Sequence, residues 1–387
     1  MNPRAETEDD IVLRFVHTAD WHLGKRFPRL AESDEVRLTR ARVEVLDRIF
    51  GAADRERAEV VLCAGDLFDT AEPAEMFWQP LLQRLQKTPP QRPIVLLPGN
   101  HDPHLPDSVW ARAHRFRQGL PAWVHVVDPP MLELPIGDHA VLYGVPCTST
   151  AGANDPTASI PVRAAGDARI RIGLVHGTTF DVKGYQMNFP ISQDAVIERG
   201  LDYLAIGDTH SFRFVPADRL VPPTIYPGAP EPTSFGEDDA GNVAIVMVTR
   251  QRQARVRTER VAQWTWEEKR VTTLAELREL RLRSDLRGRV LRLLVEMALP
   301  ADELEEAERI LVELKGDSAQ TGRVDVLELD REGLTLDSSN LAALCQDLPP
   351  VLQRAVERLV EEEAKPDRAE VARRALMQLY RLAKQAS

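Results

Sequence analysis

Five short, nearly uncharged runs of this chain each end in a cluster of Asp, His, Asn and Gly. In chain order, the runs and their clusters are 11–16 with HTADWH, 60–64 with GDLFD, 94–97 with PGNHD, 172–175 with His176, and 203–206 with GDTH. Apolar runs of this length, bounded by turn residues and separated by helical stretches, indicate buried strands. In open α/β sheets the ligand site lies beyond the carboxyl ends of the strands. We therefore expect the clusters to meet at one rim.

The clusters supply side chains that bind metal ions. A single Asp or His at a strand end is usually a helix cap or a turn former, but a series of five in order is hard to explain by caps. Oxygen and imidazole ligands without thiolate suit Mn, Fe, Zn or Mg, and more than four of them indicate two ions. The candidate ligands are Asp20, His22, Asp66, Asn100, His176, Asp208 and His210.

Length and charge limit the classes of protein to which this chain can belong. With 387 residues it exceeds what one hydrophobic core usually holds, so we expect two or more domains. The formal net charge of −11 argues against a protein that coats nucleic acid by bulk electrostatics. Nucleic acid is not excluded as a substrate, because bound cations reverse the sign of a site locally.

The first residues, the hydropathy and the cysteines of the chain predict its cellular compartment. The first residues are polar and acidic, unlike a signal peptide, and no apolar run approaches the roughly 18 residues of a membrane span. The three cysteines lie far apart in sequence, which argues against a disulfide framework or a zinc knuckle. We expect a cytoplasmic protein that does not bind a membrane.

Changes in composition and periodicity predict four regions. Strand–helix alternation passes into successive strands in the longest region, which fits a layered sandwich with helices outside. The third region is βαβ-like, with separate strands at 324–329 and 334–336 around an Asp-Arg-Glu-Gly turn. In order, the regions are a disordered tail (1–10), a main domain with all five clusters (11–265), a small α/β domain (266–338) and a helical hairpin (339–387).

The five motifs, in this order, resemble those of the calcineurin-like metallophosphoesterases. HTADWHLG, followed by GDLFD and PGNHD, is similar to the SbcD branch, the nuclease subunit of SbcCD. The resemblance implies an α/β fold: an α/β/β/α metallophosphoesterase sandwich, a small βαβ-like capping domain and C-terminal helices. It also implies two divalent ions as cofactors, with Mn²⁺ favoured and Mg²⁺, Fe²⁺ or Zn²⁺ as alternatives.

The resemblance divides the ligands between the two ions. Asp66 would bridge them, with Asp20, His22 and His210 on the first ion and Asn100, His176 and Asp208 on the second. The chain departs from the family at the fifth motif, where Gly-Asp-Thr-His replaces Gly-His-x-His. Two interpretations stay open. Either the carboxylate binds the second ion and favours Mn²⁺ or Mg²⁺, or the second site is weakened.

Roles for three further residues follow from the same motifs. By resemblance, His101 acts on the leaving oxygen of the substrate, and Asp102 orients its ring. Asp69 is expected to support a ligand or form a turn rather than to bind an ion itself. Nothing in the sequence assigns the residues that bind substrate.

The resemblance favours a DNA exonuclease or endonuclease of the SbcD type that acts in DNA repair or processing. The alternatives are a small-molecule phosphodiesterase or nucleotide phosphatase on the same fold, and a nuclease-like scaffold with a weakened second metal site. The chain has no GxxxxGK[ST] loop, so we expect no ATP hydrolysis by the chain itself. The apolar faces of the C-terminal helices would pack within the chain or bind an SbcC-like coiled-coil ATPase. A homodimer is also compatible with the sequence.

Overall fold

The computed structural model describes residues 10–87, 92–179, 187–215, 223–316, 322–337 and 349–386. The chain divides into two compact units, Met1–Trp264 and Thr265–Ser387. Residues 1–9 of the expected N-terminal tail lie outside the described residues, as does the boundary expected at residue 339.

The first unit contains two sheets, each with six strands among the described residues. In the first sheet β1, β2, β3 and β4 run parallel, while β11 runs antiparallel to β1 and β12. Its order is β12 (Ala254–Arg260), β11 (Asn242–Thr249), β1 (Ile11–Thr18), β2 (Val60–Cys63), β3 (Ile94–Leu96) and β4 (Val124–Val126).

The second sheet also has a parallel centre. Strands β6, β7, β8 and β10 run parallel, and an antiparallel strand borders them on each side. Its order is β5 (Leu132–Ile136), β6 (Ala140–Gly144), β7 (Ile170–His176), β8 (Tyr203–Gly207), β10 (Thr224–Tyr226) and β9 (Arg213–Phe214).

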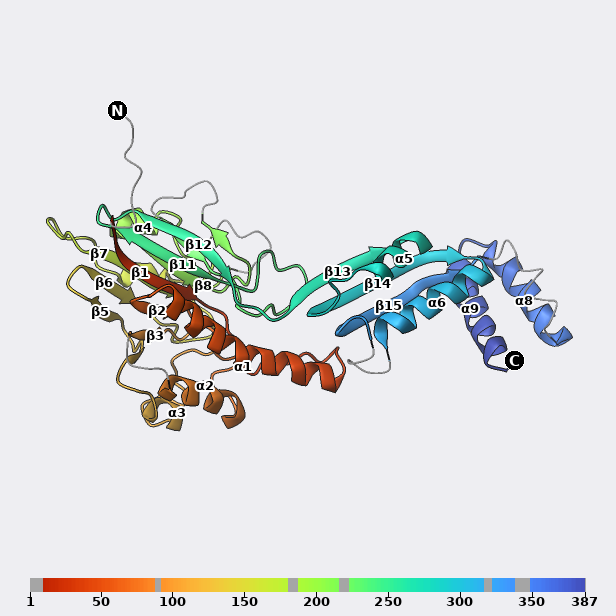
Figure 1. The fold of residues 1–387 in the computed structure, drawn as a ribbon, viewed down its shortest axis with the longest axis horizontal. Helices are drawn as coiled ribbons and strands as arrows, with labels where there is room; N and C mark the ends of the chain where they lie inside the picture. The colour runs from red at the N-terminus through yellow and green to blue at the C-terminus, as the bar shows by residue number, and fades with distance from the viewer. Residues whose placement is uncertain are drawn as a thin grey trace, which may run out of the picture. The chain divides into compact units, whose positions relative to one another are not determined.

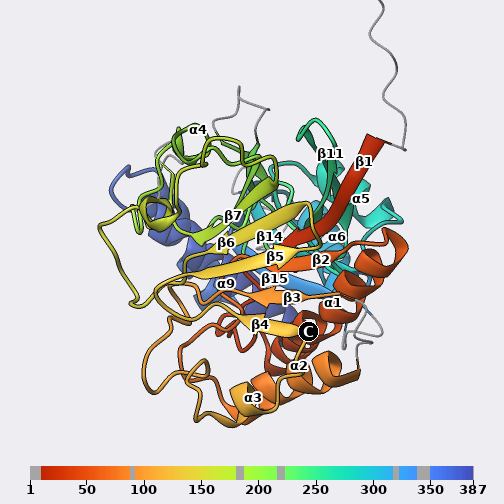
Figure 2. The same cartoon turned by 90° about the vertical axis from the view of Figure 1, so that its left-hand side faces the viewer.

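Apolar side chains join the layers of the first unit. Phe15 and Val246 of the first sheet pack with Ile172 and Tyr203 of the second in one buried cluster. The outer face of the first sheet packs against α1 (Glu32–Arg55), α2 (Glu75–Lys87) and α3 (Arg115–Gln118). The second sheet packs against the short helices η2 (Pro156–Ser159) and α4 (Ala195–Arg199). Figure 2 shows the strands in successive layers, with α2 and α3 on the outer side. The predicted α/β/β/α sandwich is confirmed.

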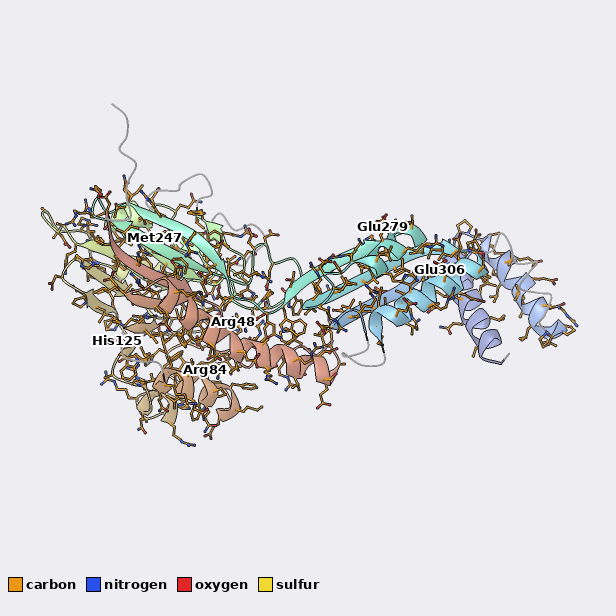
Figure 3. All side chains as sticks on the ribbon, viewed as in Figure 1. Arg48, Arg84, His125, Met247, Glu279 and Glu306 are labelled. Carbon is orange, nitrogen blue, oxygen red and sulfur yellow. The ribbon has the colours of Figure 1, made fainter. Side chains whose placement is uncertain are left out.

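The second unit is built on a parallel sheet of β13 (Thr265–Val271), β14 (Arg289–Leu299) and β15 (Val326–Leu336). Helices α5 (Leu274–Leu282) and α6 (Ala301–Lys315) connect these strands in turn (Figure 1). Helix α5 buries Leu side chains and α6 buries Leu and Ile side chains against the sheet. Of the two glutamates labelled in Figure 3, Glu279 of α5 is exposed and Glu306 of α6 is half-buried. The C-terminal helices are α8 (Pro350–Glu363) and α9 (Ala369–Ala386).

The strand β15 differs from the sequence prediction. Separate strands at 324–329 and 334–336 were expected around a turn, but the structure has one continuous strand. Asp330 pairs with Leu294 and Gly333 with Glu296, so the register shifts where the Asp-Arg-Glu-Gly segment passes. The one extra residue is accommodated as a bulge, which keeps both halves of the segment in the sheet.

The contact between the two sheets predicts a large stability effect at Phe15. Its side chain is fully buried, and its ring lies 5.1 Å from the Tyr203 ring of the other sheet. We expect Phe15→Ala to lower the free energy of unfolding by about 3–5 kcal/mol, because it opens a cavity in the core. Val36→Ala, at a side chain 62% exposed, should change it by less than about 0.5 kcal/mol. Urea denaturation measures both. Equal effects would contradict this account of the core.

Candidate metal centre

The clusters predicted to meet at one rim do meet, and both sheets contribute to them. Asp20 and His22 follow β1, Asp66 follows β2, and Asn100 follows β3 in the first sheet; His176 ends β7, and Asp208 and His210 follow β8 in the second. Hydrogen bonds join the two sides. The Nδ1 atom of His176 lies 2.8 Å from the Ala64 carbonyl oxygen, and the backbone N–H of Asp208 donates to Oδ1 of Asp20 over 3.0 Å. Three candidate ligands, Asp20, Asp66 and His176, place one ligand atom each within 4.8 Å of one another.

Each of the three imidazoles has an acceptor at its Nδ1 atom. In His22 this atom lies 3.1 Å from Oδ1 of Asp69, and in His210 it lies 2.9 Å from Oε1 of Glu237. The carbonyl oxygen of Ala64 has the same role for His176. A proton on Nδ1 that is donated to such a partner leaves Nε2 with a free lone pair. With Nδ1 engaged in this way, Nε2 is the nitrogen of each ring that can bind metal, in place of a proton.

The two Nε2 atoms of His22 and His210 lie 3.0 Å apart. If both rings donate through Nδ1, two lone pairs face each other at this distance, which is unfavourable without a cation. Asp20 completes the group, with one ligand atom of each residue within 4.8 Å of the others. The donor set of this pocket fits a divalent ion.

Asp66 lies at the centre of the cluster. Its Oδ2 atom is 3.8 Å from Nε2 of His22 and 3.5 Å from Nε2 of His176. Its Oδ1 atom accepts the backbone N–H of His101 over 2.9 Å. Burial would raise the pKa of this carboxyl, but His176 and His22 outweigh burial and lower it below the ordinary range. One charged oxygen therefore faces both groups of ligands, as a bridging ligand must.

Space beside Asp66 depends on a glycine. A Cβ atom at Gly99 would lie 2.1 Å from Oδ1 of Asp66. No such contact is tolerated, so the loop after β3 passes this close only because residue 99 lacks a side chain.

Of the other two carboxylates of the cluster, Asp20 is fully buried and Asp208 is half-buried. Burial raises the pKa of Asp20 to about 7, and the nearby His176 and His210 act in the opposite direction. At His176, burial lowers the pKa, but Asp66 outweighs it and raises the pKa to about 10. Within the described part of the chain, no Lys or Arg forms an ion pair with Asp20, Asp66 or Asp208. The cluster thus favours added positive charge.

Asp208, which departs from the family motif, is held in the cluster by Thr178. The Thr178 hydroxyl donates to Oδ2 of Asp208 over 2.9 Å. The other oxygen, Oδ1, lies 3.8 Å from Nε2 of His176, and this nitrogen lies 2.8 Å from Oδ1 of Asn100. A carboxylate oxygen, an amide oxygen and an imidazole nitrogen thus converge on the second side of Asp66.

Four of the candidate ligands have left-handed backbone conformations. The φ angles are 54° at Asp20, 45° at His22, 53° at Asp66 and 118° at Asp208. A residue with a side chain rarely adopts positive φ, and such conformations cost of order 1–3 kcal/mol each. The sharp turns after β1, β2 and β8 are therefore strained where they aim ligands into the cluster.

His101 lies at the exposed edge of the cluster. The prediction that Asp102 orients its ring is wrong. Its ring centroid is 4.9 Å from that of His22. Asp102, predicted to orient this ring, is fully buried, and its two oxygens accept the backbone N–H groups of Gly99 and Phe68. The acceptor near Nδ1 of His101 is instead the Asp69 carbonyl oxygen, at 3.4 Å. Asp102 therefore stabilises the backbone around the third motif, because its carboxylate accepts hydrogen bonds from backbone N–H groups.

Sequence reasoning missed two residues that hold His210. The hydroxyl of Thr233 lies 2.7 Å from Nδ1 of His210 and also donates to Glu237. Both residues belong to a Pro/Gly-rich turn region more than 20 residues after the fifth motif. Their only signal was an acidic residue in that turn region, which alone would also fit a solvated loop.

The fold and this cluster together define the class of protein. The model of the calcineurin-like phosphoesterase family matches residues 13–212, more than half of the chain, and the chain belongs to this family. It is a metal-dependent phosphoester hydrolase, and the Asp and His groups described above are its candidate ligands.

Among individual proteins, the chain is similar to the uncharacterized metallophosphoesterase YhaO of Bacillus subtilis. The two are 28% identical over 399 residues, which covers 91% of this chain and 94% of YhaO. A stretch of 92 residues is 35% identical to the SbcD component of the B. subtilis nuclease SbcCD, covering 23% of this chain and 22% of that protein. TT1561 of Thermus thermophilus is a solved structure with 14% identity and a TM-score of 0.37, covering 65% of this chain and 99% of TT1561. The similarity to YhaO therefore extends beyond the family domain into the second unit.

No helix among the residues that the structure describes is long and apolar enough to span a bilayer.

The position of Asp208 predicts the behaviour of two variants. Asp208→Ala should lower the bound Mn²⁺ toward one ion per chain, because it removes a charged oxygen from one side of Asp66. Asp208→His restores the family motif and should keep two ions. Metal analysis after desalting measures the stoichiometry, with Thr179→Val, beside Thr178 but without a bond to Asp208, as a control. An alanine variant that still binds two ions would show that Asp208 is not a ligand.

Proposed function

We propose that this protein hydrolyses DNA phosphodiester bonds with two divalent ions, as an SbcD-like exonuclease or endonuclease of DNA repair or processing. The substrate class is supported by the 35% identity over 92 residues with the SbcD component of the nuclease SbcCD. The observation that carries the two-ion reaction is Asp66, whose Oδ2 atom lies within 3.8 Å of imidazole nitrogens on both sides. Paired ions suit phosphodiesters, whose negative charge repels a hydroxide nucleophile.

The residues of the chain divide the chemical tasks. Bound divalent ions would neutralise the phosphate charge and lower the pKa of an attacking water molecule. Asp69 and Glu237 fix the imidazoles of His22 and His210, so these ligands need not reorganise during the reaction. His101 is exposed beside the cluster, where its ring can protonate the leaving oxygen.

The donor set favours Mn²⁺ among the candidate ions. Three carboxylates and an amide oxygen are hard donors, and three imidazoles add borderline ones, a mixture that suits Mn²⁺. Asp208 in place of the family histidine shifts the set further toward oxygen. Mg²⁺, Fe²⁺ and Zn²⁺ are alternatives for the metal analysis.

The substrate is tested with metal-stripped protein. After Mn²⁺ is added, labelled single-stranded and duplex DNA are incubated with the protein alongside cyclic and linear nucleotides. We expect DNA cleavage that EDTA abolishes. The Asp66→Ala variant should not cleave DNA, because Asp66 faces both ligand groups. Turnover of nucleotides without DNA cleavage would instead make the protein a small-molecule phosphodiesterase. A protein that binds metal but cleaves nothing would be a scaffold.

His101 gives a second, sharper prediction. His101→Gln should retain both ions and lose about 10²–10⁴-fold in turnover, the usual contribution of general acid–base catalysis. His104→Gln is the matched control, because this ring is tied to Asp128 at 3.1 Å and should have little effect. Turnover and bound metal are measured on the same preparation. Loss of metal from the His101 variant would instead identify His101 as a metal ligand.

For a partner, we propose a coiled-coil ATPase of the SbcC type that binds the C-terminal helices. The described helices bury Val356, Leu376 and Met377, yet Val351 and Val371 remain 73% and 71% exposed. Met377 belongs to the core of the second unit, so deleting α9 would damage that core. The apolar side chains that remain outside are available to a partner helix.

The partner proposal is tested with surface substitutions. Val351→Asp with Val371→Asp should abolish co-purification with the ATPase and leave Mn²⁺-dependent cleavage of short single strands intact. Arg354→Asp, at an exposed polar position of α8, is the control. Retained binding by the double variant would place the interface elsewhere.

A further inference from the structure

Arg42 of α1 is a buried cation between two segments that carry the metal centre. Its side chain is among the largest fully buried ones, and the residue is only 1% exposed. Nη1 donates to the Trp21 carbonyl oxygen over 3.2 Å, and Nη2 donates to the Pro232 carbonyl oxygen over 2.6 Å. The guanidinium carbon lies 5.5 Å from the centroid of the Phe27 ring. A desolvated guanidinium is costly unless its hydrogen bonds are well used.

Each of the two carbonyl groups belongs to a segment that holds a ligand imidazole. Trp21 stands between Asp20 and His22 in the strained turn after β1. Pro232 precedes Thr233, whose hydroxyl lies 2.7 Å from Nδ1 of His210. One planar side chain thus connects the backbone that carries His22 with the backbone that orients His210.

Arg42 also lies near carboxylates that contact the same two imidazoles. Burial lowers the pKa of its guanidinium, while Glu231, Glu237 and Asp69 act in the opposite direction. Two of these carboxylates, Asp69 and Glu237, are the partners of His22 and His210. The guanidinium is thus near both carboxylates that contact Nδ1 of a ligand ring, in addition to its bonds to the two backbone segments.

We propose that Arg42 is a positioning residue that sets the spacing of His22 and His210 and thereby the affinity of the ion that they share. The Nε2 atoms of the two rings lie 3.0 Å apart, so a small shift of either segment changes the pocket between them. The proposal rests on the metal centre of the family and does not depend on the substrate.

Arg48 offers a matched control on the same helix. It lies roughly two turns further along α1 and is labelled in Figure 3. Nη2 donates to Oε1 of Glu231 over 2.7 Å, and Nε donates to the Val261 carbonyl oxygen. Arg48 therefore anchors the residue before Pro232 but makes no hydrogen bond to the turn after β1. A general loosening of the Pro/Gly-rich turn region would follow from either substitution, whereas the spacing of the two imidazoles depends on Arg42.

The experiment compares Arg42→Met, Arg42→Lys and Arg48→Met with the unaltered protein. Mn²⁺ is titrated into the metal-stripped proteins by calorimetry, and electron paramagnetic resonance distinguishes paired from single Mn²⁺. We expect Arg42→Met to weaken one of the two ions by about 10–100-fold, the usual effect of losing the support of a ligand. Paired Mn²⁺ should give way to single Mn²⁺. The metal affinity of Arg42→Lys should lie between those of Arg42→Met and the unaltered protein, because an ammonium group cannot donate to both carbonyl groups in the geometry of a guanidinium.

Thermal unfolding in EDTA distinguishes an effect on ligand position from an effect on the stability of the protein. Arg48→Met should bind both ions within about twofold of the unaltered affinity, although it lowers the melting temperature, because the ligand spacing is unchanged. If Arg42→Met does not fold, Arg42→Lys decides the outcome. A folded Arg42 variant with two ions at unaltered affinity would overturn the proposal, and so would an equal loss of metal in Arg48→Met.

Discussion

Three carboxylates at the meeting point of two sheets, two of them buried and one half-buried, are the constraint on which the metal centre depends. Asp20, Asp66 and Asp208 have no Lys or Arg as an ion-pair partner within the described residues, so a cation must offset their mutual repulsion. The neighbouring features serve the same purpose. Acceptors at Nδ1 free the imidazole lone pairs, and a glycine lets a loop approach Asp66. The strained turns place charged oxygens where unstrained backbone would not.

The sequence was sufficient to predict which side chains converge on one rim, because the signal for each candidate ligand is local. A strand end, a turn residue and a polar side chain stand together in the chain, and the topology of a parallel sheet brings such ends to one edge. Asp102 shows the limit of local reasoning. Its position beside His101 suggested a contact between their side chains, but the backbone of the loop turns the carboxylate toward Gly99 and Phe68 instead.

Residues that act from a distance left no usable signal in the sequence. Glu237 is 27 residues from His210, and Arg42 is 190 residues from Pro232. The helix pattern places Arg42 on the apolar face of α1, one turn from Leu38 and from Leu46, but it does not show which backbone carbonyl groups the guanidinium contacts. Similarly, the polar Asp-Arg-Glu-Gly segment of β15 has the composition of a turn. Pairing with β14 keeps it in the sheet, and that pairing is a tertiary interaction.

The division of the candidate ligands between the two sheets has a consequence for folding. Asp20, His22, Asp66 and Asn100 come from one sheet, and His176, Asp208 and His210 come from the other. A chain in which only one sheet has formed would bring together at most four of these seven candidate ligands and would bind metal weakly. Ions therefore select the completed sandwich, and mass action adds the free energy of binding to the cooperativity of the whole unit. Metal supply would then govern how often the layers separate, in addition to whether the hydrolase is active.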